Sequence, residues 1–324
     1  MPDAEPPGMD CRTGVVQTLH EFSLNDPHLH PLPEADQAIR DLGRDPVQGA
    51  LLHGTRILRR PPPHLLGFRA EPPGETLTGR EQILLGGLQA VQQVRGSRYT
   101  LLGLGMHPTL SGQDRGANSQ CLQIRIGYRT GEEGEALYRK VLSLLPYLVA
   151  VSAASPFVEG TLEPAAGNRL LRFPGAWGPV VEGASTEPAS LVLRPAPGIL
   201  EIHALDEQEC IHSDLAMVAF LSALLRHPDP GITGDTGEIR ALLGIAVQYG
   251  VTRLQPELER LMAAARGSAN RDERRFLPVV ARRIEQGSLA EILRDRALGG
   301  EPLPSLLSDL VFCLKTNLPS GMVG

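Results

Sequence analysis

The stretch CLQIRIGYRTGEEGEALYRKVLSLLPYLVAVSAASP, Cys121–Pro156, contains both kinds of element that decide the fold. Its first part, CLQIRIGYR, alternates apolar and polar side chains closely enough to predict a half-buried strand. From Gly134 the pattern changes to an acidic start, a long apolar body and small residues before Pro156, which predicts a long helix. A strand followed by a long helix indicates a protein of mixed α and β structure.

The same reasoning extends outward in both directions. We expect strands in 15–23, in two apolar runs within 50–74, in the glycine-containing stretch 99–108, and in a hairpin formed by 189–195 and 198–206. We expect helices near 37–42 and 78–94, and then a run of helices at 214–225, 238–249, 255–266, 272–286 and 288–298. This order predicts an α+β fold, with an antiparallel sheet that has helices packed on one face. We expect a disordered tail over 1–12 and one domain over 13–324, its region 213–324 helical.

Composition excludes several functions. The chain has 324 residues, 42% of them hydrophobic, a formal net charge of -6 and a pI near 5.9, so nothing indicates a nucleic-acid partner. Two of the basic residues are lysines, Lys140 and Lys315, and the others are arginines. The four cysteines are far apart, without the spacing of a zinc site or a disulfide framework. With no signal peptide and no apolar run of about 20 residues, we expect a cytoplasmic protein without a membrane partner.

Polar residues inside otherwise apolar strands are the first candidates for a site. They are Glu21, Gln123 with Arg125, and Glu201 with His203. Burying a charge in a sheet is costly unless it is paired or binds a ligand, although for each residue taken alone we favour a solvent-facing position. His107, before a proline at a strand end, is either a ligand contact or a turn residue. Arg169 is either an anion-binding arginine or a surface arginine. The P-loop, GxGxxG, HExxH and GxSxG motifs are absent from the sequence.

Four ordered motifs resemble one known family. LLPYLVAVSAASPFVEG, followed by Arg169 ten residues after Glu159, is similar to a helix and loop of the glutamate–cysteine ligase type 2, or carboxylate–amine ligase, family. VLRPAPGILEIHALDEQECIHSDLAMVAFLSALLR, LLGLGMHP and LHEFSLND…PLPEAD resemble the archaeal-type members of the family in the same order. The resemblance is collinear from about residue 14 to 286.

The resemblance implies a glutamine-synthetase-like fold whose concave sheet face binds ATP, Mg²⁺ and an amino-acid substrate. It also implies ATP-dependent formation of a γ-glutamyl-type amide, in which a carboxylate is phosphorylated and an amine displaces phosphate from the acyl phosphate. That chemistry needs carboxylates that hold magnesium at the triphosphate, and arginines that hold the transferring phosphoryl group and the substrate carboxylate.

Carried over residue by residue, the resemblance assigns roles to particular positions. It implies metal ligands at Glu21 and Glu201, while Leu19 and Gly67 stand where the family has further acids. The remaining implied site residues are three catalytic arginines and four substrate- or nucleotide-binding residues: Arg125, Arg169 and Arg194, and His107, Gln123, His203 and Arg240. The chain is also short between 108 and 121 and between 172 and 190, where family members have longer segments over the site.

Two hypotheses follow from these departures. In the first, the chain is an active ligase with a reduced metal site, acting on glutamate or a similar amino acid. In the second, it is a catalytically degenerate homologue that binds a metabolite or acts as a regulatory or assembly subunit. Both require Glu21, Arg125 and Glu201 to lie on one concave face. The segment LLSDLVFCLKTNLP either packs into the core, which we favour, or forms a contact in a homo-oligomer or with a partner subunit.

Overall fold

The structure is a computed structural model, and it describes residues 14–94, 98–110, 118–172, 193–230 and 235–321. The predicted tail over 1–12 lies outside these residues. So do most of the two segments where the chain is shorter than the family, since 111–117 and 173–192 are not described.

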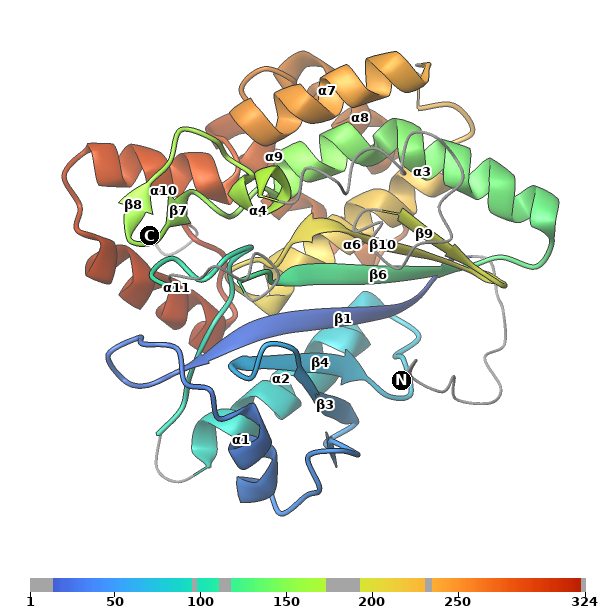
Figure 1. Cartoon of the computed structure of the whole chain (residues 1–324). Coiled ribbons are helices and arrows are strands. Elements are labelled where there is room, and N and C mark those ends of the chain that lie inside the picture. Colours follow the sequence, from blue (N-terminus) through green and yellow to red (C-terminus); the bar gives the residue numbers. More distant parts are fainter. Residues whose placement is uncertain (1–13, 95–97, 111–117, 173–192, 231–234, 322–324) are drawn as a thin grey trace.

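An antiparallel sheet forms the centre of the described chain (Figure 1). Its strands run in the spatial order β2-β3-β4-β1-β6-β10-β9, and β5 pairs with the far end of β1. Their bounds are β1 Gly14–Asn25, β2 Ala50–Leu52, β3 Thr55–Arg60, β4 Leu65–Ala70, β5 Thr100–Leu102, β6 Cys121–Gly127, β9 Leu193–Ala196 and β10 Ile199–Asp206. A separate hairpin joins β7 Phe157–Val158 and β8 Thr161–Leu162.

Helices cover one face of this sheet because alternate strand residues are apolar on that side. Phe22, Phe68, Ile124 and Ile202 are all fully buried there. The helices that pack on the strands are α2 Leu77–Gln93, α3 Gly131–Ser152 and α6 Ile211–Arg226. The predicted α+β fold, with an antiparallel sheet and helices on one face, is confirmed. The opposite face, which we call the open face, carries the polar side chains that alternate with these apolar ones along the strands.

The remaining helices form a second layer outside the first, or pack at one end of the sheet. Figure 1 shows α3 between the sheet and α7, and α7 packs against α3. The bounds are α1 Ala35–Asp41, α4 Asn168–Leu171, α7 Thr236–Tyr249, α8 Gln255–Ser268, the short 3-10 helix Glu273–Arg275, α9 Leu277–Gln286, α10 Leu289–Leu298 and α11 Leu303–Thr316. None of the described helices is long and apolar enough to cross a bilayer.

The longest helix begins and ends for identifiable reasons. The side chain of Thr130 caps α3 by accepting a hydrogen bond from the backbone N–H of Glu133. Two acidic residues follow in the first turn, where the helix dipole favours negative charge. The apolar body from Val141 is buried, and the helix ends at Ser152, four residues before Pro156. The prediction of a long helix in this stretch is therefore confirmed.

Two other predictions concern segments at the ends of the sheet. α11 packs Leu306, Leu307 and Leu310 into a second apolar cluster with Leu102, so the predicted core packing of the C-terminal segment is confirmed. The hairpin of β9 and β10 is also present, with Gly198 at a positive φ of 74° in its turn.

The stretch 99–108 is only partly a strand. It is extended over Thr100–Leu102 and then passes closely under the loop that follows β10. A Cβ at Gly103 would lie 2.1 Å from the backbone oxygen of Gln208, and one at Gly105 would lie 2.3 Å from the carboxylate carbon of Asp206. The predicted close backbone approach at the glycines is therefore confirmed. What lies against them is another segment of this chain, at Asp206 and Gln208, and not a ligand.

Candidate active face of the sheet

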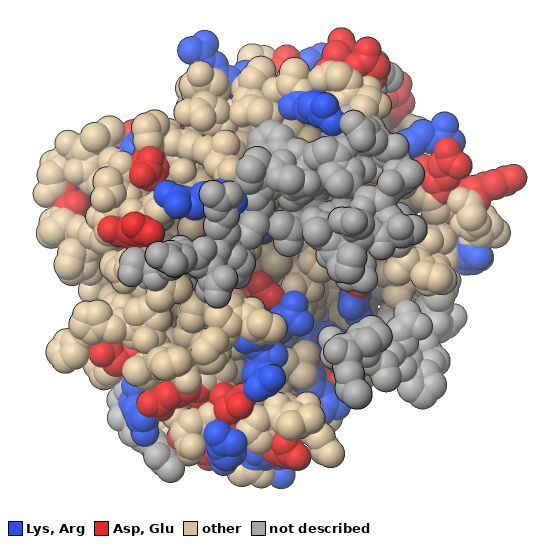
Figure 2. Space-filling model, viewed as in Figure 1, with Lys and Arg blue, Asp and Glu red and all other residues tan. Residues whose placement is uncertain are grey.

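The open face brings together the polar residues that the sequence singled out. Arg125 of β6 pairs in register with Gln17 of β1 on one side and with Glu201 of β10 on the other, so the three side chains lie on the same face. Glu21 lies further along β1 on this face, because residues i and i+4 of a strand point the same way. The required convergence of Glu21, Arg125 and Glu201 on one face is present. Figure 2 shows basic side chains gathered around a hollow beside these strands.

Glu21 is almost buried, and both of its carboxylate oxygens accept hydrogen bonds. Oε1 accepts from Arg60 Nε at 2.9 Å and from Gln123 Nε2 at 3.0 Å. Oε2 accepts from the backbone N–H of Cys121 at 3.1 Å and from its thiol at 3.4 Å. Burial raises the pKa of the Cys121 thiol, and the Glu21 carboxylate raises it further, so the thiol stays protonated and donates. Glu21 is thus held by a full set of donors.

Glu201 is held in a similar way on the neighbouring strand. Its Oε1 lies 2.7 Å from Arg125 Nη2, and its Oε2 lies 3.3 Å from His203 Nε2. Arg125 also donates from Nη1 to the side-chain oxygen of Gln17 at 3.3 Å. The Arg125 side chain is one-third exposed, whereas that of Glu201 is only 12% exposed. The guanidinium therefore lies nearer the solvent than the carboxylate that it neutralises.

Leu19 and Gly67 lie side by side on the same face. A Cβ at Gly67 would be 3.1 Å from Cδ1 of Leu19 and 3.2 Å from Cγ and Cδ of Arg60. The stem of Arg60 thus runs across the space that a side chain at 67 would occupy, and this path lets its Nε reach Glu21. The two positions where the family has further acids are therefore adjacent. An arginine now occupies the space between them and the remaining acid.

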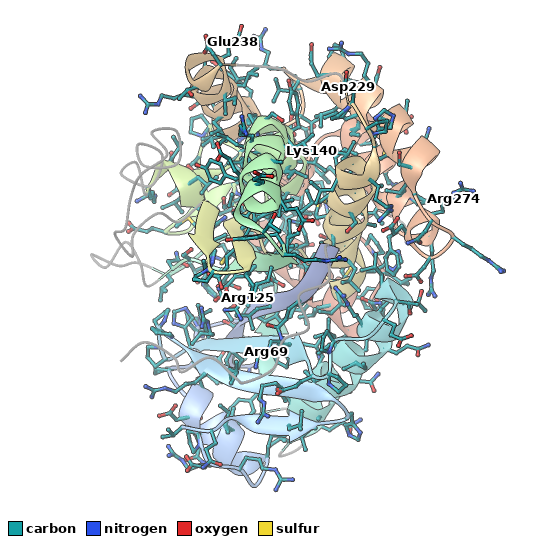
Figure 3. All side chains as sticks on the ribbon, turned by 90° about the vertical axis from the view of Figure 1, so that its right-hand side faces the viewer. Arg69, Arg125, Lys140, Asp229, Glu238 and Arg274 are labelled. Atoms are coloured by element: carbon teal, nitrogen blue, oxygen red, sulfur yellow. The ribbon has the colours of Figure 1, made fainter. Side chains whose placement is uncertain are left out.

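Arg69 adds a further guanidinium to this face. In β4 it follows Phe68, which pairs with His20, so continuing the register by one residue places it beside Leu19. Its Nε is buried and has no hydrogen-bond partner among the described residues, while its Nη2 lies 3.6 Å from Glu71. Burial lowers the pKa of Arg69, Glu71 acts in the opposite direction, and the charge of Arg125 lowers it further. Figure 3 shows Arg69 and Arg125 on neighbouring parts of the sheet.

The two carboxylates expected to hold magnesium do not fit that ion in this arrangement. Mg²⁺ requires near-ideal octahedral oxygen coordination, with carboxylate oxygens that are free to bind it. Both oxygens of Glu21 already accept hydrogen bonds, and the two oxygens of Glu201 lie against Arg125 and His203. An ion would have to displace Arg60 from Glu21 and Arg125 from Glu201, and bring its charge beside the guanidiniums it displaced.

Arg169 is fully buried, and its charge interacts with those of Asp206 and Glu21. Its Nε donates to Asp206 Oδ1 at 2.6 Å, and its two Nη groups donate to the backbone oxygens of His203 and Ala204 at 3.2 and 2.6 Å. Burial alone would lower the pKa of Arg169, but the Asp206 carboxylate raises it, so the side chain stays charged. These contacts account for the whole guanidinium without a substrate, and the catalytic role that the resemblance implied stays a prediction.

The remaining predicted arginines lie in different places. Arg194 is opposite Glu201 in the register of β9 and β10, which puts its backbone beside the open face, and its side chain lies outside the described part. Arg240 is exposed on α7, in the helix layer that packs on α3. The structure therefore brings together Glu21, Gln123, Arg125, Glu201 and His203, places the buried Arg169 within electrostatic reach of Glu21, and puts Arg240 in a different layer.

His107 is buried at the far end of β1. Its Nε2 lies 2.8 Å from the side-chain oxygen of Asn25, and its ring lies 6.4 Å from the ring of His64. Burial, reinforced by the neighbouring histidines, lowers the pKa of His107 to about 3, and burial lowers that of His64 to about 4. His107 is therefore a neutral histidine within the fold, and its predicted contact with substrate is not visible in this structure.

These two histidines predict a loss of stability in weak acid. In the unfolded chain a histidine binds a proton below about pH 6.5, whereas these two bind one in the folded protein only near pH 3 to 4. The contribution of these histidines to the unfolding free energy is therefore fully present above about pH 6.5 and is lost as the pH falls towards 4. Each histidine should account for about 2 kcal/mol of unfolding free energy between pH 7 and 5. Urea unfolding measures this loss. Between pH 7 and 5 the unfolding free energy of His107→Gln should fall by about 2 kcal/mol less than that of the wild type, whereas His28→Gln, which changes an exposed histidine, should lose as much as the wild type. If the unfolding free energy of His107→Gln depended on pH as steeply as that of the wild type, this account would be contradicted.

Sequence reasoning missed Arg60 and Arg69. Both lie in predicted strands, and the alternation of TRILRR puts Arg56, Leu58 and Arg60 on one face. That pattern carried a signal for two basic positions on one face, but the pairing of β3 with β4, and of β4 with β1, was needed to show that the face is the one that holds Glu21.

Solved structures that share this fold include those of two ligases. Over 94% of its length the chain matches 52% of the chain in the crystal structure of a bifunctional glutathione synthetase from Pasteurella multocida, with a TM-score of 0.60 and 12% identity. It also matches 69% of a chain in the complex between the prokaryotic ubiquitin-like protein Pup and its ligase PafA, with a TM-score of 0.52 and 13% identity. The chain thus spans about half the length of the glutathione synthetase chain. These likenesses show the fold, which is that of the carboxylate–amine ligases.

The sequence itself identifies the family. The model of glutamate–cysteine ligase family 2 (GCS2) matches residues 19–183, just over half of the 324 residues. The chain belongs to glutamate–cysteine ligase family 2, and the resemblance drawn from its motifs is confirmed. A relative, described as an uncharacterized protein of Archaeoglobus fulgidus, is 28% identical over 364 aligned positions, which cover 94% of this chain and 99% of that protein.

Proposed function

We propose that this chain is an ATP-dependent carboxylate–amine ligase of glutamate–cysteine type, in which arginines on the open face hold the anionic reactants. The observation that supports the proposal is the position of Arg60, Arg69 and Arg125. They lie on the open face, over the strands that carry Glu21 and Glu201, and the family resemblance implies that ATP and an amino-acid carboxylate bind to this face. Guanidinium groups bind phosphate and carboxylate oxygens in pairs, so they can supply positive charge where metal-binding acids are missing.

The charges on this face favour an anionic ligand. Arg125 and Arg69 repel one another, and an anion between them would remove that repulsion. Arg60 and Arg125 are each about one-third exposed, so both can turn a donor outward while they remain paired to a carboxylate. Gln123 and His203 complete the face with further side chains that can form hydrogen bonds. We therefore expect the triphosphate of ATP and the substrate carboxylate to lie along β1 and β6.

The proposed reaction has two balanced steps. A carboxylate oxygen of glutamate or a similar amino acid attacks the γ-phosphorus, and ADP leaves with the electrons of the broken P–O bond. An amine then attacks the acyl carbon, phosphate leaves, and the nitrogen loses a proton. In both steps the arginines would hold the oxygens on which negative charge develops. Because Glu21 and Glu201 do not fit magnesium as they are arranged, no step is assigned to a protein-bound metal. We place the reaction in the cytoplasm, with small amino acids as the substrates.

A second candidate is a catalytically degenerate homologue that binds an anionic metabolite on the same face as a regulatory or assembly subunit. It is favoured by one specific arrangement. Leu19 and Gly67 replace two acids at adjacent positions, and Arg60 fills the space between them and Glu21. An arginine that neutralises a former metal ligand would preserve ligand binding and remove phosphoryl transfer.

ADP release separates the two candidates. With ATP, magnesium, glutamate and a panel of amines, the ligase should release ADP only when both the acid and the amine are present. Glu201→Gln should lower that rate by about 10- to 100-fold, because it removes the partner that orients Arg125. Arg59→Met, at an exposed position next to Arg60, serves as the control and should keep the rate. Binding of ATP without ADP release under any combination would favour the degenerate homologue and contradict the ligase.

A further inference from the structure

The last residue of β10 and the loop that follows it bury three acidic residues in four positions. Asp206, Glu207 and Glu209 are each at most 2% exposed. Two of them form an ion pair with a buried arginine. Asp206 pairs with Arg169, and Glu209 Oε1 lies 2.5 Å from Nη2 of Arg283. A buried carboxylate is tolerated when such a partner balances its charge. Glu207 is the exception, since no arginine or lysine among the described residues is paired with it.

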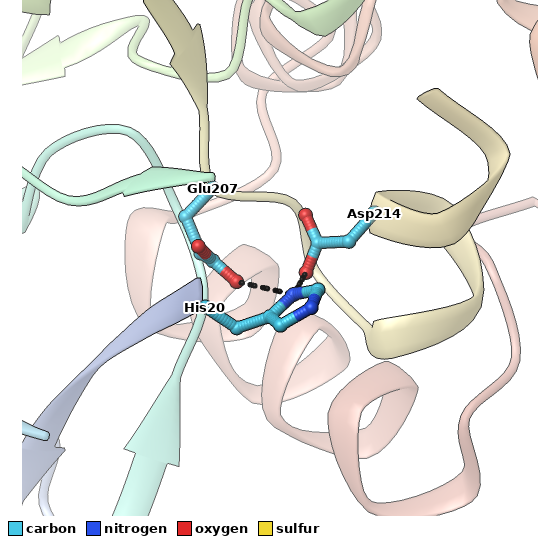
Figure 4. Close-up of side chains that lie close together, drawn as sticks. All are labelled: His20, Glu207 and Asp214. Atoms are coloured by element: carbon cyan, nitrogen blue, oxygen red, sulfur yellow. Dashed lines mark hydrogen bonds and ion pairs between the residues drawn. The ribbon is translucent and has the colours of Figure 1, made fainter. Parts of the chain in front are cut away.

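Glu207 instead lies beside a second acid and a histidine (Figure 4). His20 Nδ1 is 3.0 Å from Asp214 Oδ2 and 3.7 Å from Glu207 Oε1, and all three side chains are fully buried. His20 is on the helix side of β1, so this cluster is on the opposite side of the sheet from Glu21. The backbone N–H of Glu21 nevertheless donates to Glu207 Oε2 at 2.8 Å, which fixes the carboxylate against β1.

The hydrogen bonds around the cluster leave acceptors facing one another. His20 Nε2 is 3.0 Å from Thr18 Oγ1, and when Nε2–H donates to that hydroxyl, Nδ1 turns a lone pair towards the carboxylates. Asp214 Oδ1 accepts from the backbone N–H of Gln208 at 3.0 Å, which leaves Oδ2 for the cluster. Glu207 Oε1 is buried and has no hydrogen-bond partner in the described chain. One nitrogen and two oxygens therefore converge within 4.8 Å of one another, and no arginine or lysine among the described residues is paired with either carboxylate.

We propose that His20 Nδ1, Glu207 Oε1 and Asp214 Oδ2 bind one divalent transition-metal cation. An imidazole nitrogen with two carboxylate oxygens is a donor set that suits zinc, and the hydroxyl of Thr18 would fix the ring as a supporting hydrogen bond does at other histidine ligands. A divalent ion balances both carboxylates, and it joins β1 to the start of α6 through the β10–α6 loop. The site has a structural role in the core and is independent of the function proposed for the open face.

The first experiment compares the full-length chain refolded with and without zinc. The protein is unfolded in denaturant with EDTA, then refolded either in EDTA or with one equivalent of Zn²⁺, desalted, and analysed for metal by mass spectrometry. The zinc-refolded protein should retain about one zinc per chain and melt about 5–10 °C above the EDTA-refolded protein. Less than about 0.1 zinc per chain with equal melting temperatures would overturn the proposal, and the cluster would then share protons instead.

Variants locate the ion. Asp214→Asn and Glu207→Gln keep the size of each side chain but remove its charge, and each should reduce retained zinc at least about 10-fold and abolish the zinc-dependent rise in melting temperature. The control is Asp26→Asn, because Asp26 forms an exposed pair of the same type, 3.2 Å from His30 Nδ1. It should retain zinc like the wild type. Full zinc retention in both cluster variants, or loss of zinc in Asp26→Asn, would overturn the assignment. If the cluster variants do not fold, the wild-type refolding comparison decides.

Discussion

Arg169→Met should destabilise the protein by about 3–5 kcal/mol, because it leaves the buried Asp206 carboxylate without its cation. Asp206 is held from three sides: by Arg169, by the backbone N–H of Ala154 at 2.8 Å and by Ser155 Oγ at 2.9 Å. Two backbone carbonyls of β10 also lose their donor in this variant. Equilibrium unfolding in urea, monitored by circular dichroism, measures the loss.

Arg139→Met is the matched control for Arg169→Met. Arg139 pairs with Glu135 on the surface of α3, and its side chain is 72% exposed, so its removal should change stability by less than about 0.5 kcal/mol. Arg169→Lys restores the charge without the planar set of donors and should fall between the two. If Arg169→Met were no more destabilising than Arg139→Met, the role of Arg169 in joining α4 to β10 would be wrong.

The fold was predictable because its signals are local. The alternation in CLQIRIGYR and VVQTLHEFS and the long apolar body after Val141 each predict one element, and the motifs placed the elements in a known order. The partial failure at 99–108 has a physical cause. Gly103 and Gly105 are needed for contact with Gln208 and Asp206, which lie more than 100 residues further along the chain, and no local pattern reports such a contact.

The candidate site was predictable only where the alternation of one strand was enough. Glu21, Gln123, Arg125 and Glu201 were found because each is a polar residue in an apolar strand. Arg60 was not predicted as a site residue because it lies in TRILRR, where several residues are basic. Its contact with Glu21 depends on β3 lying two strands from β1 and on the absence of a side chain at Gly67. The His20, Glu207 and Asp214 cluster escaped for the same reason, since its members are brought together only by the packing of α6 on β1.

Loss of a single guanidinium from the open face should weaken ATP binding by about 10- to 100-fold, since a hydrogen bond to a charged group contributes about 1.5–3 kcal/mol. Arg125→Met removes the donor beside Glu201, and Arg60→Met removes the donor beside Glu21. Each also exposes the negative charge of its carboxylate partner, which repels phosphate. Isothermal titration calorimetry of ATP into each variant measures the effect.

Arg59→Met is a close control for these variants. Arg59 neighbours Arg60 in β3, but it is 62% exposed and pairs with Asp36, away from Glu21. Its removal should change the affinity for ATP by less than about 3-fold, through net charge alone. Equal losses in Arg59→Met and Arg60→Met would mean that ATP responds to the overall charge and not to a site on the open face.

The most direct measurement is the titration of ATP into the wild-type chain in the presence of EDTA, repeated with magnesium. If arginines hold the anionic reactants, ATP should bind saturably without magnesium, at least as tightly as with it, and the affinity should fall as salt is raised. Binding that occurs only when magnesium is added would contradict this account, because it would mean that Glu21 and Glu201 release their arginines to hold a metal. Absence of binding in both conditions would contradict it as well.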